Sequence, residues 1–361
     1  MSQANLAAPK FGDRIKNIIR NYPSGWIVLM ALILLPFVTA IVNGQSIRDL
    51  LSNGLGVAKF VQGLAIEVFI LALYALSYDL VLGVTGLLSF GHAMFFAVGA
   101  YVTGIMLKNF SWSLWATLGM VLVAALIQAF LFAVVLPRVQ GITFALVTLG
   151  IASVFYIVIQ SQELSVYTGA DVGLQGVVTP AFINATDHRM RFYFVALSLL
   201  VAMYLLFRRF LNSPTGHVCV AIRENEMRAR MLGYNTFYFK MIVLTLASIT
   251  AALAGSLHAL FEPIVSPYTA SMEFTIAALL MTLIGGLGTL SGALVGAAIY
   301  RLLEYGLNSY FGEQANFLLG VVYVLIVLFL PYGIIGTWNL RALQIRSGWE
   351  RLLGLLYRKP K

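Results

Sequence analysis

Residue types that carry out chemistry are sparse in this chain, and those present are scattered. The four histidines and the carboxylates show no spacing typical of a metal site, and the single cysteine, Cys219, excludes an intramolecular disulfide. The chain contains no Gly-Lys dipeptide, so it lacks the Gly-x-x-x-x-Gly-Lys-Ser/Thr loop that holds nucleotide phosphates. These patterns argue against an enzyme, and they predict no cofactor and no metal in the chain itself.

Polar and small side chains gather in residues 86–101, at the start of a hydrophobic stretch. The serine and the histidine bring polar groups to the expected membrane edge, where such groups usually face other helices or a water-filled path. The glycines allow another backbone to approach closely. A translocation pathway fits this pattern, and so does a helix-packing seam with the histidine bonded to a backbone carbonyl. The residues concerned are Ser89, Gly91, His92, Phe95 and Gly99.

Few charged side chains interrupt the hydrophobic segments. Glu67 lies about 10 Å inside one of them at a rise of about 1.5 Å per residue. An ionised carboxylate there costs roughly 2–3 kcal/mol on insertion scales, so Glu67 either lines a pathway or faces the helix bundle in a structural role. Asp79 is expected at the membrane interface. Arg301 and Glu304, three residues apart, are expected to form a local ion pair.

The composition identifies the solvent in which the chain folds. Hydrophobic residues make up 60% of the 361 positions and charged residues 10%, whereas soluble domains have about 45–50% apolar and about 25% charged residues. The excess indicates a membrane protein. The net charge of +9 comes from basic residues at the chain ends and in one internal segment, beside hydrophobic stretches. That placement is typical of cytoplasmic loops and not of a surface that binds nucleic acid.

The hydrophobic segments predict an all-α polytopic protein. A membrane-spanning helix needs about 20 apolar residues. The N-terminal residues have a basic amphipathic pattern, so we expect an interfacial helix that leads into an uncleaved first span rather than a signal peptide. Hydropathy alone predicts nine spans: residues 25–42, 60–82, 88–107, 112–136, 142–159, 192–207, 240–261, 274–303 and 317–335.

The distribution of lysine and arginine predicts the direction of each span. The segments 1–24, 208–239 and 337–361 are basic, and the last is also amphipathic, so both termini and the internal segment are expected in the cytoplasm. Residues 160–191 and 262–273 lack such a bias and are expected outside. An odd number of crossings must therefore follow residue 262, whereas hydropathy supplies only two.

A glycine-rich segment resolves this count. Residues 285–292 divide the stretch 274–303 into two short halves, and glycine favours turns over helix. Two crossings joined there as a helical hairpin bring the prediction to about ten transmembrane helices, whereas a single long tilted helix is the alternative. The glycines of the broken segment are Gly285, Gly286, Gly288 and Gly292.

The internal basic segment 208–239 contains a short amphipathic helical pattern that we expect to end at Gly233, because glycine terminates helices. A helix held outside the membrane between two spans docks a cytoplasmic partner or rests on lipid headgroups, and the pattern leaves both open. Its predicted apolar side comprises Val218, Ala221, Ile222, Ala229 and Leu232. The residues considered for docking are Gly216, Ala221, Arg223, Glu224, Glu226 and Gly233.

Four motifs follow one another between about residue 60 and residue 336. They are Gly86-x-x-Ser89-x-Gly91-His92-Ala93-x-Phe95-x-x-x-Gly99-Ala100-Tyr101, Thr168-Gly169-Ala-Asp171-x-Gly173-Leu174-x-Gly176, Ala221-Ile222-Arg223-Glu224-Asn225-Glu226-x-x-Ala229-x-x-x-Gly233 and Leu283-Ile284-Gly285-Gly286-Leu287-Gly288-Thr289-Leu290-x-Gly292. Together they resemble the LivM-type permeases of branched-chain amino acid ABC importers. His217 stands where that family commonly has a basic residue, and Asn225 stands where it often has aspartate.

The resemblance implies a transport subunit and its partners. Residues 25–336 would be the transmembrane permease domain, paired in the bacterial inner membrane with a second, LivH-type permease. Two cytoplasmic ATPase subunits would bind ATP and Mg and dock on the helix in segment 208–239. A periplasmic solute-binding protein would dock near residues 168–176, in the external loop 160–191.

Two alternatives stay open at this point. An ion-coupled secondary transporter would also use a glycine-broken helix, since such transporters place broken helices at their binding sites. The same ABC architecture also imports urea, amides or aromatic acids in related permeases, so the solute itself is not identified by the sequence.

Overall fold

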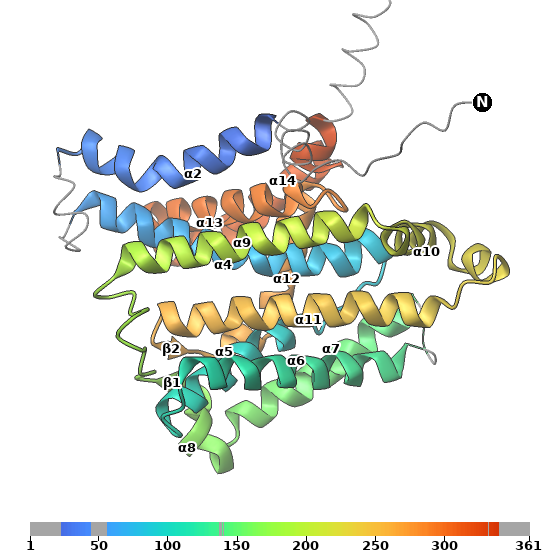
Figure 1. The fold of residues 1–361 in the computed structure, drawn as a ribbon, viewed down its shortest axis with the longest axis horizontal. Helices are drawn as coiled ribbons and strands as arrows, with labels where there is room; N and C mark the ends of the chain where they lie inside the picture. Colours follow the sequence, from blue (N-terminus) through green and yellow to red (C-terminus); the bar gives the residue numbers. More distant parts are fainter. Residues whose placement is uncertain (1–22, 45–55, 137–138, 140, 331, 339–361) are drawn as a thin grey trace, which may run out of the picture.

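The computed structural model describes residues 23–44, 56–136, 139, 141–330 and 332–338, and these are helical apart from loops and two strands of two residues each (Figure 1). The predicted basic segments 1–24 and 337–361 fall outside the described residues except at their inner edges. The long helices form one bundle in which most of the axes are roughly aligned (Figure 1). They are α2 (Pro23–Val42), α4 (Val57–Asp79), α5 (Ala93–Lys108), α6 (Leu114–Val135), α7 (Ile142–Gln160), α9 (Arg189–Leu211), α11 (Thr236–Phe261), α12 (Met272–Gly285), α13 (Ser291–Phe311) and α14 (Ala315–Phe329).

Seven helices within the described residues are long and apolar enough to cross a membrane, and two shorter apolar helices, α5 and α12, lie among them. This result confirms the predicted class, an all-helical membrane protein with many spans. The remaining long helix, α13, carries Arg301 and Glu304 and is therefore less apolar.

Short polar side chains set the starts of several helices. Ser113 accepts a hydrogen bond from the Ala116 amide at the start of α6, and Ser271 accepts one from the Phe274 amide at the start of α12. These bonds satisfy backbone donors that have no partner inside the helix, which is costly to leave unmet in an apolar environment. These two helices thus begin where serine precedes an apolar run.

The centre of the bundle is formed where α5 and α11 approach each other closely. A Cβ atom on Gly99 would lie 2.0 Å from the carbonyl oxygen of Ala252, and one on Gly255 would lie 2.0 Å from that of Phe96. The Thr103 hydroxyl donates to the Ser256 hydroxyl at 2.9 Å across the same contact. Small residues therefore allow the two backbones to touch, as in other helix pairs within membranes.

The glycine-rich segment after α12 forms a tight hairpin. α12 ends at Gly285, α13 begins at Ser291, and the two helices pack antiparallel. A Cβ atom on Gly285 would lie 1.8 Å from the carbonyl oxygen of Gly292, and one on Gly296 would lie 1.8 Å from that of Met281. The predicted break is confirmed, and the alternative of a single long helix is wrong.

The segments between helices separate to two ends of the bundle. β1 (Leu174–Gln175) and β2 (Ile264–Val265) pair antiparallel, so the loops 160–191 and 262–273 meet at one end, together with α8 (Ser165–Thr168) (Figure 1). The Lys108 ammonium at the end of α5 donates to the Gln175 carbonyl at 2.7 Å there. α10 (Pro214–Met231) lies at the opposite end (Figure 1). We refer to these as the β1–β2 end and the α10 end.

Candidate functional site

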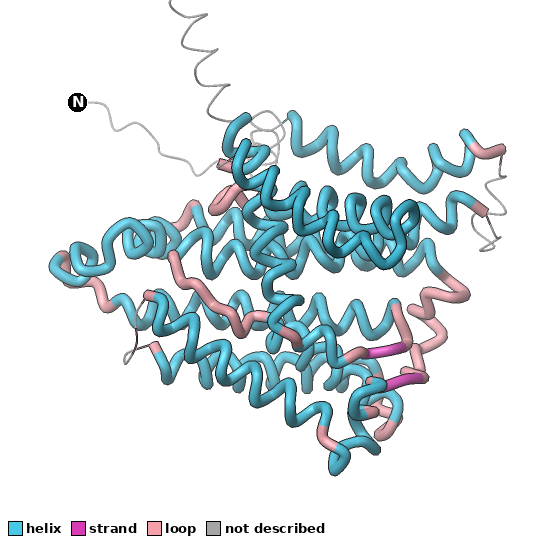
Figure 2. Tube along the Cα trace, turned by 180° about the vertical axis from the view of Figure 1, so that it is seen from behind, coloured by secondary structure: helices cyan, strands magenta, loops and turns pink. Residues whose placement is uncertain are grey.

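α10 connects α9 to α11 and projects beyond the ends of its neighbours, as the views from both sides show (Figures 1 and 2). Ser213 accepts a hydrogen bond from the Gly216 amide at 3.2 Å, and Pro214 occupies the first turn, where proline costs no backbone bond. A Cβ atom on Gly216 would lie 2.3 Å from the Phe210 carbonyl oxygen. Gly216 therefore allows the sharp turn out of α9, and α10 leaves the bundle at a fixed angle.

α10 is interrupted at Asn225, which the sequence pattern did not indicate. Asn225 has an extended backbone (φ −160°, ψ 98°), and its side-chain oxygen accepts a hydrogen bond from the Arg228 amide at 2.9 Å. Asn225 thus caps a second short helix that begins beside it. Aspartate makes the same cap, so the departure from the motif at this position preserves the local structure.

The end of α10 agrees with the prediction. Gly233 has a φ of +89°, its amide donates to the Arg230 carbonyl, and the Tyr234 amide donates to the Ala229 carbonyl. These two bonds close the helix in the Schellman pattern, which requires a residue with positive φ.

The predicted apolar side of α10 is only partly correct. Ile222 and Ala229 are buried, but Leu232 is 73% exposed and Ala221 is also exposed. The interruption at Asn225 changes the direction of the helix, so the periodicity predicted for one continuous helix does not continue through it.

Arg223 connects α10 to two distant parts of the chain. Its guanidinium donates a hydrogen bond to the carbonyl oxygen of Gly83, which lies in a π-helical turn (Leu80–Val84) that extends α4. Cβ atoms built on Gly86 and Gly288 would lie 3.1 Å from Arg223 Cγ and 2.8 Å from its Nη1. The motifs around residues 86, 223 and 288 therefore meet at one point, which their separation in sequence did not reveal.

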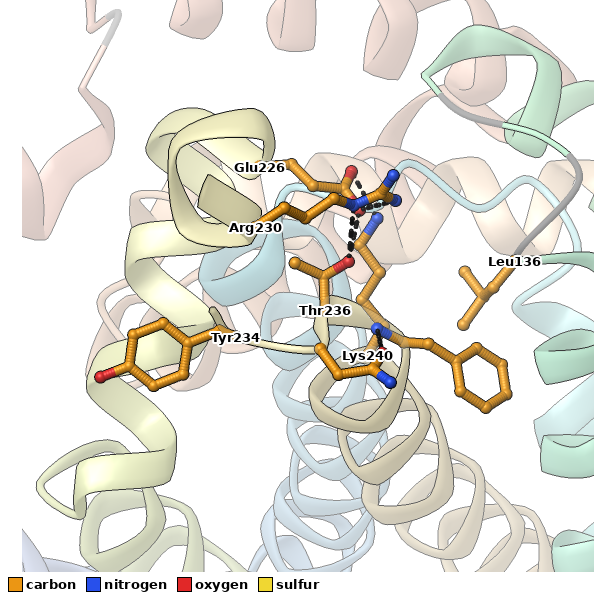
Figure 3. A pocket seen from close by; sticks show the side chains of 8 residues that line it. Leu136, Glu226, Arg230, Tyr234, Thr236 and Lys240 are labelled. Carbon is orange, nitrogen blue, oxygen red and sulfur yellow. Dashed lines mark hydrogen bonds and ion pairs between the residues drawn. The ribbon is translucent and has the colours of Figure 1, made fainter. Parts of the chain in front are cut away.

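Glu226 joins α10 to the start of α11 through a cluster of polar bonds. Its carboxylate lies 2.7 Å from the Lys240 ammonium and 2.8 Å from the Arg230 guanidinium, and it accepts a bond from the Thr236 hydroxyl at 2.9 Å (Figure 3). These side chains border a cavity of about 350 Å³ that also contacts Leu136. Burial alone would raise the pKa of Glu226, but its bonds to Lys240, Thr236 and Arg230 lower that pKa below its usual value of 4.5.

The lowered pKa predicts that acid weakens the link between α10 and α11. Because the pKa of Glu226 is lower in the folded protein, the stability that it contributes is complete above pH 4.5 and is lost as the pH falls through the lower folded value. We expect Glu226→Gln to lower the free energy of unfolding by about 1–2 kcal/mol at neutral pH and by little in acid. Thermal unfolding across this pH range would measure the difference. Glu163→Gln, an exposed change at the other end, serves as the control, and an effect of Glu226→Gln that is the same at all pH values would contradict the prediction.

The outer face of α10 carries apolar side chains that are mostly exposed. Met227 is 62% exposed and Met231 is 79% exposed, beside the exposed Leu232. Glu224 is exposed on the same segment. Unbranched methionine adapts its shape to different partners and is common at binding surfaces. The end of α10 therefore presents an apolar surface with charged neighbours outside the bundle.

The residues predicted for a pathway or a packing seam lie in the packed interior. Ser89, His92 and Phe95 have no exposed surface, and a Cβ atom on Gly91 would lie 2.3 Å from the Thr148 carbonyl oxygen. His92 Nε2 lies 2.8 Å from the Ser77 hydroxyl oxygen, so the expected bond to a backbone carbonyl is wrong for this nitrogen. These contacts, with those of Gly99, favour helix packing as the role of the segment.

A second, partly exposed polar cluster forms where α4 meets α13. The Arg301 guanidinium forms an ion pair with Glu67, with Nε donating at 2.6 Å, and a second ion pair with Glu304 at 2.7 Å. The predicted pair of Arg301 and Glu304 is confirmed. Glu67 faces the bundle and pairs with a residue 234 positions away, a partner that no local spacing could identify.

Asp79 is enclosed by protein, which its sequence position did not indicate. Its side chain is fully buried, and Oδ1 accepts a hydrogen bond from the Gly288 amide at 2.6 Å. α4 continues through its π-helical turn beyond Asp79, so other segments of the bundle surround this carboxylate, and its expected depth at the membrane interface stays a prediction.

Comparisons with known proteins match most of the chain to one family. A family model described as "Branched-chain amino acid transport system / permease component" matches residues 60–330. The permease LivM of Salmonella typhimurium is 25% identical over 309 residues, which cover 79% of this chain and 72% of that protein. LivM of Escherichia coli K12 is 26% identical over 72% of this chain and 66% of that protein, slightly less than two thirds of its length. LivH of the same strain is 24% identical over 73% of this chain and 91% of that protein. No solved structure matches the chain.

Proposed function

Because this chain belongs to the family of branched-chain amino acid transport permease components, we propose that it is one permease subunit of an ATP-driven importer for a small polar solute. Membership makes it a multi-pass membrane protein of a bacterial inner-membrane permease family and not an enzyme. The proposed assembly contains a second, LivH-type permease, two ATPase subunits that bind ATP and Mg, and an external solute-binding protein. The relatives named LivM and LivH support this pairing.

The proposed topology has ten crossings, with the α10 end in the cytoplasm. Seven candidate spans, the apolar helices α5 and α12, and α13 supply the ten helices that this topology needs. The pairing of β1 with β2 supports placing residues 160–191 and 262–273 on one side, as the charge distribution predicts. The basic segment that contains α10 lies at the other end. In this topology the loop 168–176, which contains glycines, lies outside, where the external binding protein would dock.

The observation that carries the proposal is α10 itself. It stands outside the bundle, exposes Met227, Met231 and Leu232, and is tied back to the spans through Arg223 and Glu226. A surface of this kind gives an ATPase subunit an apolar patch to bind and a rigid link through which to act. We therefore propose that α10 is the ATPase-docking helix. Gly216 and Gly233 set its two ends, and Ala221, Arg223, Glu224 and Glu226 supply its contacts and anchors.

Branched-chain amino acids are the solute that we propose, on the strength of the family and of relatives at about 25% identity. Urea, amides and aromatic acids fit the same architecture. An ion-coupled transporter is less supported, because the glycine-rich turn lies beside Arg223 at the α10 end. Such transporters instead place broken helices near the middle of the membrane.

The proposal is tested by uptake in reconstituted vesicles. We expect the chain, its LivH-type partner and the ATPase subunits to purify as one complex. With the binding protein present, the complex should take up labelled leucine only when ATP is supplied on the ATPase side. Uptake by the isolated chain without ATP would contradict the proposal and would favour an ion-coupled transporter. ATP-dependent uptake of urea or an aromatic acid in place of leucine would retain the architecture and change the solute.

The docking role of α10 predicts a large effect at its exposed methionines. We expect Met227→Glu combined with Met231→Glu to lower the ATPase subunits recovered with the permease about tenfold or more, because apolar anchors contribute most of the binding energy in such contacts. The measurement is co-purification of the ATPase on the tagged chain. Val166→Glu, at a 75% exposed apolar position of the opposite end, is the matched control. Equal recovery from the α10 variant and the control would exclude this docking surface.

A further inference from the structure

Asp79 is a buried carboxylate that accepts fewer hydrogen bonds than a buried negative charge needs. Its side chain has no exposed surface, Oδ1 accepts one hydrogen bond from the Gly288 amide, and Oδ2 has no partner among the described residues. A carboxylate taken out of water is stabilised only by several hydrogen bonds or by an opposite charge. Because Asp79 lacks the hydrogen bonds, it requires a positively charged side chain nearby.

The opposite charge comes from α10, outside the bundle. The Arg223 guanidinium donates to the carbonyl oxygen of Gly83, four residues after Asp79, and its Nη1 would lie 2.8 Å from a Cβ atom built on Gly288, the residue whose amide donates to Asp79. Asp79 is fully buried whereas Arg223 is exposed on α10, so Arg223 brings a charge from the surface helix to the edge of the bundle. Arg223 therefore binds one backbone carbonyl, and this carbonyl lies close in the chain to a carboxylate whose second oxygen has no partner among the described residues.

Glycines leave the space that this arrangement needs. A Cβ atom on Gly83 would lie 2.1 Å from Asp79 Oδ1 and 2.5 Å from the Gly288 amide nitrogen, closer than real contacts allow. Gly288 has a φ of +74°, and a Cβ atom there would lie 2.9 Å from the Gly83 carbonyl oxygen. Three backbones thus converge on two side chains: the π-helical turn after α4, the turn between α12 and α13, and α10.

We propose that Asp79 is a positioning residue that pairs with Arg223, and that this pair transmits the movement of α10 to α4 and to the α12–α13 hairpin together. The inference rests on the proposed docking of ATPase subunits on α10. If α10 shifts, Arg223 carries its charge with it, and Asp79 must follow or lose the charge that stabilises it. Because Asp79 also holds Gly288, the hairpin moves with α4. The π-helical turn is a segment in which such a shift is accommodated, since these turns often occur at functional sites.

The test separates ATP hydrolysis from transport. The complete complex, with both permeases, the ATPase subunits and the binding protein, is reconstituted in vesicles, and labelled leucine uptake is divided by ATP hydrolysed. We expect Asp79→Asn and Arg223→Gln each to lower this ratio about five- to tenfold, the scale of coupling within one hydrogen-bond network. ATPase recovery should be unchanged in Asp79→Asn, because that side chain is buried inside the bundle and is not on the docking surface. The double variant should be no worse than either single variant, since both remove the same pair. Arg223→Lys, which keeps the charge, should restore part of the ratio.

Thr282→Val is the matched control. Thr282 is fully buried in the same hairpin, but its hydroxyl bonds only to carbonyls of its own helix, so its loss should leave the ratio unchanged. A wild-type ratio in Asp79→Asn, or additive losses in the double variant, would overturn the inference alone. If the Asp79→Asn complex does not assemble, the Arg223→Gln variant tests the inference, because Arg223 lies in α10 outside the bundle. A wild-type ratio of uptake to ATP hydrolysis in Arg223→Gln would then overturn the inference. A wild-type complex without ATP-dependent uptake would overturn the proposed function as well.

Discussion

Replacing Gly296 by alanine should destabilise the protein, whereas the same replacement at Gly306 on the same helix should be neutral or stabilising. A Cβ atom at Gly296 would lie 1.8 Å from the carbonyl oxygen of Met281 and 3.0 Å from the Gly285 amide nitrogen. Both atoms belong to the backbone of α12, so no side chain can rotate away. The two helices would have to separate, and overpacking of this kind costs about 1–3 kcal/mol or more.

Gly306 provides the internal control. A Cβ atom there meets nothing within 4 Å, and alanine favours helix over glycine by roughly 0.5–1 kcal/mol. Thermal unfolding of the two variants in detergent, monitored by circular dichroism, measures the difference. Because the two substitutions should change the stability in opposite directions, the comparison specifically tests the packing of α12 on α13. Equal stability of the two variants would mean that the hairpin does not pack as described.

The second large effect is expected at Arg301, where two carboxylates share one cation. Glu67 and Glu304 both pair with its guanidinium, and all three side chains are about a quarter exposed, between 23% and 27%. Arg301→Met keeps the length of the side chain and removes the charge. We expect it to lower the free energy of unfolding by about 3 kcal/mol, since breaking a largely buried ion pair leaves a charge without a partner.

A second variant distinguishes the cost of losing the ion pair from the cost of leaving the Glu67 carboxylate without a partner. Glu67→Gln added to Arg301→Met should restore part of the stability, because the amide requires no counter-charge. Urea or thermal unfolding of the single and double variants gives this comparison, with Glu273→Gln near the start of α12 as the control for loss of a carboxylate. If the two substitutions destabilise additively, Glu67 and Arg301 do not act as a pair.

The features that sequence predicted correctly are those set by local chemistry or by the solvent. Composition requires a bilayer, and the spans follow from runs of apolar residues. The break between α12 and α13 was predictable because glycines at positions 285–292 disfavour a continuous helix, and because the charge distribution required one more crossing. Gly233 was predicted as the end of α10 for a similar reason, since a positive φ at this position is a local property of glycine.

The tertiary structure alone decided which of the polar residues meet. Glu67 and Arg301 are 234 residues apart, and Gly288 is 209 residues from Asp79, so no helical period links them. Asp79 was placed at the interface because it stands near the end of an apolar run, but the π-helical turn after α4 buries it. The interruption at Asn225 depends on a side-chain cap that a continuous periodic pattern conceals.

The physical reason for this division is the range of the forces involved. By itself the sequence determined the membrane environment, the approximate spans and the glycine-rich turn, because transfer of apolar surface and backbone preference act on each segment separately. Pairing of buried charges depends on which helices become neighbours. Packing of glycine backbones in α5 on α11 and in α12 on α13 selects those neighbours, and only the folded chain therefore reveals the contact of Arg223 with the turns at Gly83 and Gly288.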